Sequence, residues 1–430
     1  MKPGRVKPGR VWMSRTTLVV SLAVAVMMAL SGWAGAQLAA GPPPTPVPPD
    51  GSLSPFPQVL HTPADALSPP DLSAASAILI DQDSGQVLLA EDADSARAIA
   101  SITKIMTGLL VLERTDLNEV VTVTADAVIA EDDRPGISAL GLREGEQISV
   151  RDLLYALLLQ SANDAAVALA DHVDGSVGRF VKRMNARALR LGMSHTRFYS
   201  PNGLDDRGYS SARDLAILTR AAMSTAGFSS VAVTRFRTIP GPDGIDREIQ
   251  NRDALLWLYP GATGVKTGFT SRAGYCVVAT AERDGRRLVA VVLGAPNDAF
   301  SDAAALLNHG FSAFTRHTFV RVGEPAGVVT LAGGSVAVET AGDLEALVPT
   351  GAVDAARLQI VVRVGAAYPP APGERVAVLK VTIPGLTVGR VPLVVSSVPP
   401  PPSIEDAPWW ERAVGSVADA LTSAFRAVTG

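Results

Sequence analysis

The 430-residue chain has one cysteine, Cys276, so no intramolecular disulfide can stabilise it. Its five histidines are scattered, and none has the spacing of metal ligands: they are His61, His172, His195, His309 and His317. Lysine and arginine total 38 against 42 acidic residues, which leaves no basic excess for nucleic acid. We therefore expect an apolar core to supply the stability, Cys276 to be a small buried side chain, and no metal, cofactor or nucleic-acid partner.

The sequence also lacks a long apolar run near its start. Residues 1–15 carry five basic side chains and no acid, residues 16–30 are apolar, and Ala34-Gly35-Ala36 precedes Gln37. This order predicts a secretory signal peptide over residues 1–36, because 15 apolar residues are short for a membrane anchor. Its removal leaves 33 basic against 42 acidic residues, a net charge of −9. Residues 37–71 are rich in proline and predict an extended linker.

A nearly uncharged stretch, residues 100–110, predicts a buried helix that begins near Ser101. Residues three apart share a helix face, so the amine of Lys104 can reach the hydroxyl of Ser101. Its neighbours on that face carry no carboxylate, so burial should lower the pKa of Lys104. A neutral lysine can take the proton of a serine nucleophile. Taken singly, Ser101 could equally well be an ordinary helix cap, and Lys104 an ordinary surface lysine.

The second motif is Ser161-Ala162-Asn163, a predicted turn between helices at 150–160 and 164–172. Ser149 and Asp152 have the spacing of a capping box at the start of the first helix. The turn can present Ser161 as a proton relay and Asn163 as a contact for a substrate carbonyl. Taken alone, this motif is better explained as the end of one helix and the start of the next, since serine and asparagine favour helix caps.

The third motif lies on the first strand of a predicted β-hairpin. The hairpin region comprises residues 264–270, an alternating segment at 275–280, a turn at 284–285 and an apolar run at 288–294. Lys266 supplies a positive charge, Thr267 and Thr270 supply hydroxyls, and Gly268 lets another backbone approach. An anionic, extended substrate could pair along this strand, although a lysine also protects an exposed edge strand.

Together the three motifs resemble the Ser-x-x-Lys, Ser-x-Asn and Lys-Thr-Gly boxes of the penicillin-recognising serine acyl-transferases. The chain is most similar to the low-molecular-mass penicillin-binding proteins that act as D-alanyl-D-alanine carboxypeptidases. Further similar segments are 77–81, 83–85, 194–196, 201–204, 209–215, 251–252 and Tyr275. The resemblance covers residues 72–316 and implies an α+β catalytic domain with an antiparallel sheet flanked by helices.

The resemblance implies that Ser101 is the acylated nucleophile, Lys104 its general base and Ser161 a proton relay. Asn163 would contact the substrate amide, and Arg252 would help to hold the terminal carboxylate. The substrate-binding strand would contribute the remaining site residues, Lys266, Thr267, Gly268, Phe269 and Thr270. The backbone N–H groups of Ser101 and Phe269 would form the oxyanion hole. Phe269 is a departure, because some relatives carry histidine there.

The resemblance implies peptidoglycan stem peptides as substrates and β-lactam antibiotics as inhibitors. A class A β-lactamase would need a Glu-x-x-Leu-Asn run between Asn163 and Lys266, and the sequence has none. A D,D-endopeptidase that cleaves crosslinks uses the same boxes. A non-catalytic peptidoglycan-binding protein, or an interaction protein that works through its C-terminal part, would share the fold. Covalent labelling at Ser101 would distinguish an enzyme from these two kinds of protein.

The chain after the catalytic region predicts a small β domain over residues 317–398. Its expected strands are 327–331, 335–339, 358–364, 375–383 and 387–397. Residues 399–430 predict a proline-rich hinge and an amphipathic helix with an apolar stripe through Trp410, Val417, Leu421 and Phe425. Such a helix can lie in a membrane interface, or pack on the protein or a second copy. We expect an extracytoplasmic protein at the outer face of the bacterial cytoplasmic membrane.

Overall fold

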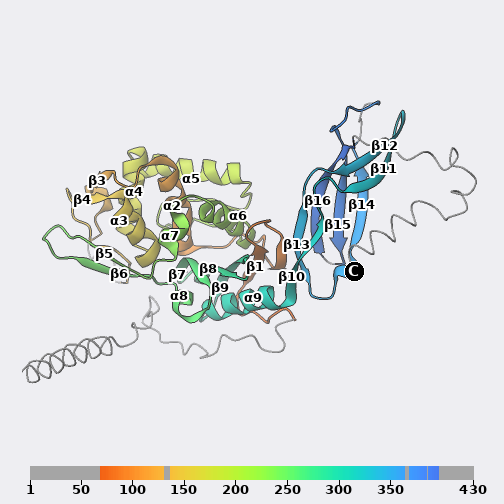
Figure 1. The fold of residues 1–430 in the computed structure, drawn as a ribbon. Helices are drawn as coiled ribbons and strands as arrows, with labels where there is room; N and C mark the ends of the chain where they lie inside the picture. Colours follow the sequence, from red (N-terminus) through yellow and green to blue (C-terminus); the bar gives the residue numbers. More distant parts are fainter. Residues whose placement is uncertain (1–67, 130–135, 364–367, 385, 397–430) are drawn as a thin grey trace, which may run out of the picture. The chain divides into compact units, whose positions relative to one another are not determined.

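The computed structural model describes residues 68–129, 136–363, 368–384 and 386–396 (Figure 1). The predicted signal peptide, the predicted linker up to residue 67 and the predicted C-terminal helix fall outside these ranges. All described residues belong to one compact unit of the chain. Within these ranges, no helix combines the length and apolar character needed to cross a membrane.

A five-stranded antiparallel sheet forms the centre of the larger region, with strand order β2-β1-β9-β8-β7. Its strands are β1 (Ser76–Asp81), β2 (Val87–Glu91), β7 (Ala262–Thr270), β8 (Gly274–Arg283) and β9 (Arg286–Ala295). Strand β7, which carries Lys266, lies at one edge, as the sequence predicts. Asp284 and Gly285 both have positive φ, 51° and 70°, as a two-residue hairpin turn requires.

Helices cover both faces of this sheet (Figure 1). Successive residues of β1 point to opposite faces, so Ile78 packs with the helices that surround α2 and Leu79 packs against α9. The helices are α2 (Lys104–Arg114), α3 (Val150–Tyr155), α4 (Asn163–Asp174), α5 (Val177–Leu191), α6 (Ala212–Met223), α7 (Phe228–Ala232), α8 (Leu255–Leu258) and α9 (Phe300–Ala313). This arrangement confirms the predicted α+β class.

Helix α2 is the central helix of the larger core, and every residue from Lys104 to Val111 is buried. A 3-10 turn, Ala100–Thr103, precedes it, so Ser101 lies in the turn that leads into the helix. The predicted buried helix is therefore confirmed. Two short hairpins complete the region: β3 (Val120–Thr122) with β4 (Gln147–Ser149), and β5 (Phe236–Ile239) with β6 (Arg247–Gln250).

The C-terminal region contains a second antiparallel sheet with strand order β11-β12-β16-β15-β14. Its strands are β11 (Pro325–Leu331), β12 (Gly334–Thr340), β14 (Arg357–Val362), β15 (Arg375–Ile383) and β16 (Leu386–Val395). Each overlaps a strand expected from alternation. Its apolar core includes Val338, Val381 and Leu393.

Two further strands, β10 (Phe314–Val320) and β13 (Leu344–Pro349), pair with each other and were not predicted. The middle of β10 is the polar run Thr315–Thr318, which hides the alternation that marks a half-buried strand. Strand β10 runs across the expected domain boundary at residues 316 and 317. Leu347 of β13 exchanges two hydrogen bonds with Gln86, which ties this pair to the turn between β1 and β2.

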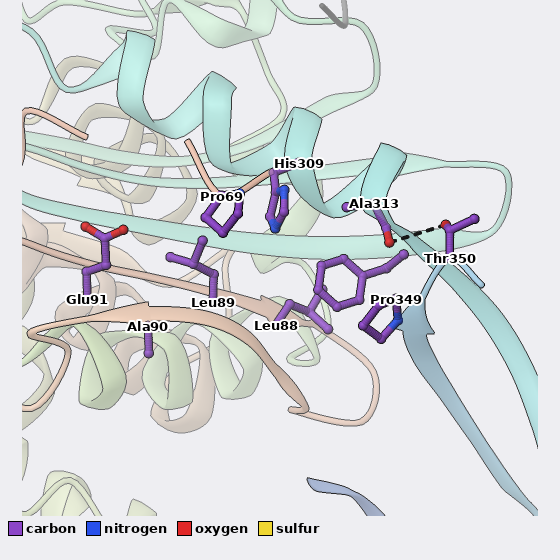
Figure 2. Close-up of a pocket in the computed structure, with 10 residues that line it drawn as sticks. Pro69, Leu88, Leu89, Ala90, Glu91, His309, Ala313, Pro349 and Thr350 are labelled. Carbon is purple, nitrogen blue, oxygen red and sulfur yellow. Dashed lines mark hydrogen bonds between the residues drawn. The ribbon is translucent and has the colours of Figure 1, made fainter. Parts of the chain in front are cut away.

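A cavity of about 560 Å³ lies beside edge strand β2, the C-terminal end of α9 and the end of β13 (Figure 2). Leu88, Leu89 and Phe314 give it an apolar lining, and Thr350 closes one side by donating to the carbonyl oxygen of Ala313 at 3.3 Å. The residues that line it include none of the predicted site residues. The chemistry predicted for this chain therefore lies elsewhere on the fold.

Candidate active site

Ser101 and Lys104 are brought together at the start of the central helix. The Nζ atom of Lys104 lies 2.9 Å from Ser101 Oγ, the contact that their spacing predicts. Lys104 is completely buried, whereas Ser101 is half-buried. Ala100, directly before the serine, has a φ of 47°, and a left-handed residue other than glycine costs on the order of 1 kcal/mol. The surrounding packing thus holds the serine on a strained turn.

Lys104 has two other partners, and both can only accept a hydrogen bond. Nζ donates to Asn163 Oδ1 at 2.8 Å and to the carbonyl oxygen of Asn202 at 2.7 Å. A neutral amine has two N–H groups and one lone pair, so these acceptors leave the lone pair for the hydroxyl of Ser101. Burial holds the pKa of Lys104 well below its usual range, and the charges of Lys266 and Arg252 lower it further.

Asn202 contacts Lys104 through its carbonyl oxygen, and the sequence identified it only as part of a family-like segment. Its carbonyl reaches Lys104 because Gly203 follows with a φ of 83°. A Cβ at position 203 would lie 2.0 Å from the carbonyl oxygen of Ala100, which no packing adjustment could accommodate without moving backbone. The glycine is therefore required for the 201–204 segment to close over the lysine.

The predicted turn between helices is present at residues 161–163. A π-helical turn, Ala156–Gln160, continues α3, and Ser161 then adopts the left-handed conformation with a φ of 64°. Ser149 caps α3 by accepting from the N–H of Asp152 at 3.0 Å, as predicted. Asn163 begins α4, and its Nδ2 donates to Ser138 O at 2.8 Å, which orients Oδ1 toward Lys104. The other N–H of this amide has no partner among the described residues, so it could meet a substrate carbonyl.

Strand β7 passes directly beside the serine turn. A Cβ at Gly268 would lie 3.1 Å from the backbone nitrogen of Ser101, so the glycine permits the close approach that was predicted. Lys266 is buried and donates to the carbonyl oxygen of Thr267 at 3.0 Å.

The end of strand β7 is more exposed. Phe269 is 39% exposed, and its ring packs against that of Tyr275 with centroids 4.6 Å apart. Thr270 Oγ1 accepts from Ala273 N at 3.1 Å in the adjoining turn.

Arg252 is positioned by its neighbour Asn251, which is almost completely buried. The side-chain nitrogen of Asn251 donates to the carbonyl oxygens of Ala232 and Thr234, each at 3.0 Å. The backbone N–H of Arg252 donates to Leu159 O at 3.1 Å, close to the Ser161 turn. Burial lowers the pKa of the Arg252 guanidinium. The charge of Arg252 also lowers the pKa of Lys104 and that of Lys266.

Asp253, which directly follows Arg252, is almost completely buried and was missed by sequence reasoning. Burial raises its pKa to about 7, while burial and the charge of Arg252 lower the pKa of Lys266 to about 7. Its position directly after the Asn251-Arg252 pair was the one feature of the sequence that could have pointed to it.

Cys276 is the small structural side chain that alternation predicts. It is buried, and desolvation raises its pKa to about 11.

The family model of the D-alanyl-D-alanine carboxypeptidases matches residues 63–297, more than half of the chain. The chain belongs to this family. The family predicted from the three boxes, a low-molecular-mass penicillin-binding protein, is thereby confirmed, and serine-type carboxypeptidase chemistry with it.

Carboxypeptidases of several bacteria are similar to this chain. D-alanyl-D-alanine carboxypeptidase DacF of Bacillus subtilis is 35% identical over 57% of this chain and 64% of its own length. DacB2 of Mycobacterium tuberculosis is 38% identical over 58% of this chain and 86% of its own length. The chain thus aligns with somewhat less than two thirds of the Bacillus carboxypeptidase and with most of the mycobacterial one.

Solved structures extend the likeness to the fold beyond the matched region. Penicillin binding protein 5 from Haemophilus influenzae has a TM-score of 0.65 and 29% identity, and the match covers 78% of this chain and 99% of that one. Penicillin binding protein 6B from Escherichia coli has a TM-score of 0.60 and 32% identity over 76% of this chain and 97% of that one. The carboxypeptidase fold of this chain is therefore shared with penicillin-binding proteins.

Proposed function

We propose that this protein removes the terminal D-alanine from peptidoglycan stem pentapeptides through an acyl-enzyme on Ser101. The observation that carries the proposal is the buried Lys104 amine, 2.9 Å from Ser101 Oγ and otherwise surrounded by acceptors. A lysine in that environment is neutral more readily than usual, so it can act as a base. β-Lactams, whose strained amide replaces the D-Ala-D-Ala peptide bond, would acylate the same serine.

In the proposed reaction, Lys104 takes the Ser101 proton while Oγ attacks the carbonyl carbon of the penultimate D-alanine. The carbonyl oxygen becomes an oxyanion, and the N–H groups of Ser101 and Phe269 would stabilise it. Support for that pair is the close approach of Gly268 to Ser101 N. The C–N bond then breaks, and the leaving amine of the terminal D-alanine gains a proton through Lys104 and Ser161. Water attacks the ester in the second half-reaction and frees Ser101.

The terminal carboxylate of the substrate would lie against Arg252, Lys266 and Thr267. Both basic side chains are at least half-buried, where charge-assisted hydrogen bonds to a carboxylate are strong. Strand β7 is an edge strand, so a peptide could pair along it beside Thr267, Gly268 and Thr270. Asn163 would contact the substrate amide through its remaining N–H.

Mass spectrometry of muropeptides incubated with the purified protein tests this function. Pentapeptides should lose one D-alanine, and Ser101→Ala should abolish both this loss and the covalent labelling by penicillin. Labelling or D-alanine release that survives the substitution would overturn the assignment of Ser101. Cleavage of crosslinked dimers with little loss of D-alanine from pentapeptides would favour the endopeptidase alternative instead.

We further infer that the protein works outside the cytoplasm, in keeping with a family that acts on the cell wall. The predicted signal peptide, the separate β domain, and the proline-rich hinge with its interfacial helix at 399–430 are parts of this proposal. Deletion of residues 403–430 should release the mature protein from liposomes and leave hydrolysis of soluble peptide unchanged. Replacing Val417, Leu421 and Phe425 together by Asp should do the same, because each buried apolar side chain contributes about 1.5–3 kcal/mol. Unchanged lipid binding, or lost soluble activity, would contradict the membrane role.

A further inference from the structure

Arg272 is an exposed basic residue that the proposed reaction does not use. It lies in the turn between β7 and β8, where Thr270 accepts a hydrogen bond from Ala273 N at 3.1 Å. Its Nη1 donates to the backbone carbonyl oxygen of Asp206, and no carboxylate of the described residues forms an ion pair with its guanidinium. The positive charge and most of the five N–H groups are therefore left for a ligand.

The contact with Asp206 joins the end of β7 to a loop that borders the proposed site. Asp206 follows closely on Asn202, whose carbonyl oxygen accepts from Lys104 Nζ at 2.7 Å. Between the two, Gly203 lies against the turn that carries the serine and leaves no space for a Cβ. The Arg272 side chain therefore spans from the turn after β7 to the loop beside the proposed nucleophile.

The direction in which a substrate would lie along β7 follows from the order of residues in this strand. Gly268 lies beside Ser101, since a Cβ at Gly268 would be 3.1 Å from Ser101 N. Lys266, which is proposed to bind the terminal carboxylate, precedes Gly268, whereas Arg272 follows it. A peptide with its carboxylate at Lys266 and its scissile bond at Ser101 therefore extends its acyl part toward Arg272.

The acyl part of a pentapeptide is long enough to reach this turn. Strand residues advance about 3.4 Å each, so the end of β7 at Thr270 lies roughly 7 Å beyond Gly268. The fourth stem residue forms the acyl-enzyme, so the third and second residues would lie at the level of the turn. Phe269, which is 39% exposed, adds an apolar surface on the same segment for the aliphatic part of a third side chain.

We propose that Arg272 is a specificity-determining residue that binds a second carboxylate, on the acyl side of the stem peptide. This inference rests on the proposed carboxypeptidase function. The planar guanidinium matches a carboxylate through two parallel N–H groups. That carboxylate can come from the side chain of the third stem residue or from a free α-carboxylate of the second.

Arg207, in the loop that Arg272 contacts, is already paired. Its guanidinium forms an ion pair with Asp205 at 2.6 Å and lies over the ring of Tyr199, 4.7 Å from the centroid. Arg272 has neither kind of partner among the described residues. The structure therefore leaves Arg272, and not Arg207, to bind an incoming anion.

Three pentapeptides that differ only in amidation test the proposal. Each has meso-diaminopimelate as its third residue, D-glutamate as its second and a free terminal D-alanine carboxylate. Both acyl-side carboxylates are amides in the first peptide; the second frees only that of diaminopimelate, and the third only that of D-glutamate. Wild-type enzyme should hydrolyse the second or the third with a kcat/KM about threefold to fivefold above that of the first, as expected for an exposed ion pair. The preferred peptide identifies the source of the carboxylate.

Two substitutions of Arg272 separate its charge from its contact with the loop. Arg272→Gln can still donate to Asp206 O but has no charge, and should bring the three kcat/KM values together. Arg272→Lys keeps the charge without the planar fork and should retain part of the preference. Arg190→Gln is the matched control, because Arg190 is exposed on α5, which carries none of the proposed site residues, and it should leave the preference unchanged.

Salt provides a readout that a purely structural role of Arg272 would not move. The preference of the wild-type enzyme should shrink as the salt concentration rises from about 0.05 M to about 0.5 M. Equal kcat/KM for all three peptides, a preference that survives Arg272→Gln, or one that salt does not change would overturn the inference. Wild-type protein that releases D-alanine from none of them contradicts the proposed function itself. Equal release from all three contradicts only the role of Arg272.

Discussion

The region around Ser101 and the β region that follows it bury different kinds of side chain. Lys104, Asn163, Asp253 and Lys266 are all nearly inaccessible in the first, whereas Thr340 is the only buried polar residue among the described residues after 313. Two of the four described non-glycine residues with positive φ, Ala100 and Ser161, lie at the proposed site, and the other two, Asp92 and Asp284, lie in turns of the same region. The comparison teaches that buried charge and backbone strain concentrate where chemistry is proposed, while the β region follows ordinary packing rules.

The largest expected effect comes from removing the base in the first region. Lys104→Arg keeps a positive charge but replaces a group that can lose its proton with one that cannot. We expect acylation by penicillin to fall by at least about a hundredfold, within the range that general base catalysis supplies. Stopped-flow acylation kinetics would measure this. Near wild-type acylation would mean that the buried lysine serves only the structure. The buried charge of the region around Ser101 would then not distinguish it functionally from the β region.

The pH dependence of acylation should show the same buried lysine directly. Its pKa is lowered, so the neutral form dominates above a midpoint well below the ordinary lysine value and disappears as the pH falls through that midpoint. Acylation should therefore drop about tenfold for each pH unit below the midpoint. An acyl donor without a carboxylate keeps the titration of Lys266 out of the measurement. A midpoint near the ordinary lysine value would contradict the desolvated environment.

A smaller effect is expected at Arg252, which is proposed to bind and not to react. Arg252→Ala should raise KM about tenfold for a peptide with a free carboxylate, because a charge-assisted hydrogen bond contributes roughly 1.5–3 kcal/mol. The C-terminal amide of the same peptide should be affected much less. Steady-state kinetics on the matched pair would measure the difference. Equal effects on both peptides would place the function of Arg252 elsewhere.

The smallest effect on activity is expected in the β region. Leu393→Ala should lower the free energy of unfolding by about 2–5 kcal/mol, since the side chain is completely buried in its apolar core. The folded enzyme should keep its kcat/KM. The matched variant is Leu109→Ala, equally buried but on the helix that carries Lys104, where we expect both stability and activity to fall. Denaturant unfolding and peptide hydrolysis together would measure both quantities. An activity loss in Leu393→Ala would remove the functional distinction between the regions.

Much of the site was readable from sequence because its contacts are local. The three-residue spacing of Ser101 and Lys104 places them on one helical face in any helical conformation, whether 3-10 or α. Gly268 predicted a close backbone approach because glycine alone lacks a Cβ. The strands of the β region were readable from alternation, except β10 and β13, whose pairing depends on partners distant in the sequence.

Sequence by itself determined the family, the α+β class and the residues that carry the proposed chemistry. The Ser-x-x-Lys, Ser-x-Asn and Lys-Thr-Gly motifs define short-range geometry, and the spacing of apolar residues indicates which helices and strands pack together. Only the tertiary structure decided what surrounds those residues. The carbonyl of Asn202, 98 residues from Lys104 along the chain, completes the environment of the amine. The buried oxygen of Asp253, which has no hydrogen-bond partner among the described residues, likewise follows from packing. Desolvation and charge proximity depend on which distant segments meet, and no local pattern contains that information.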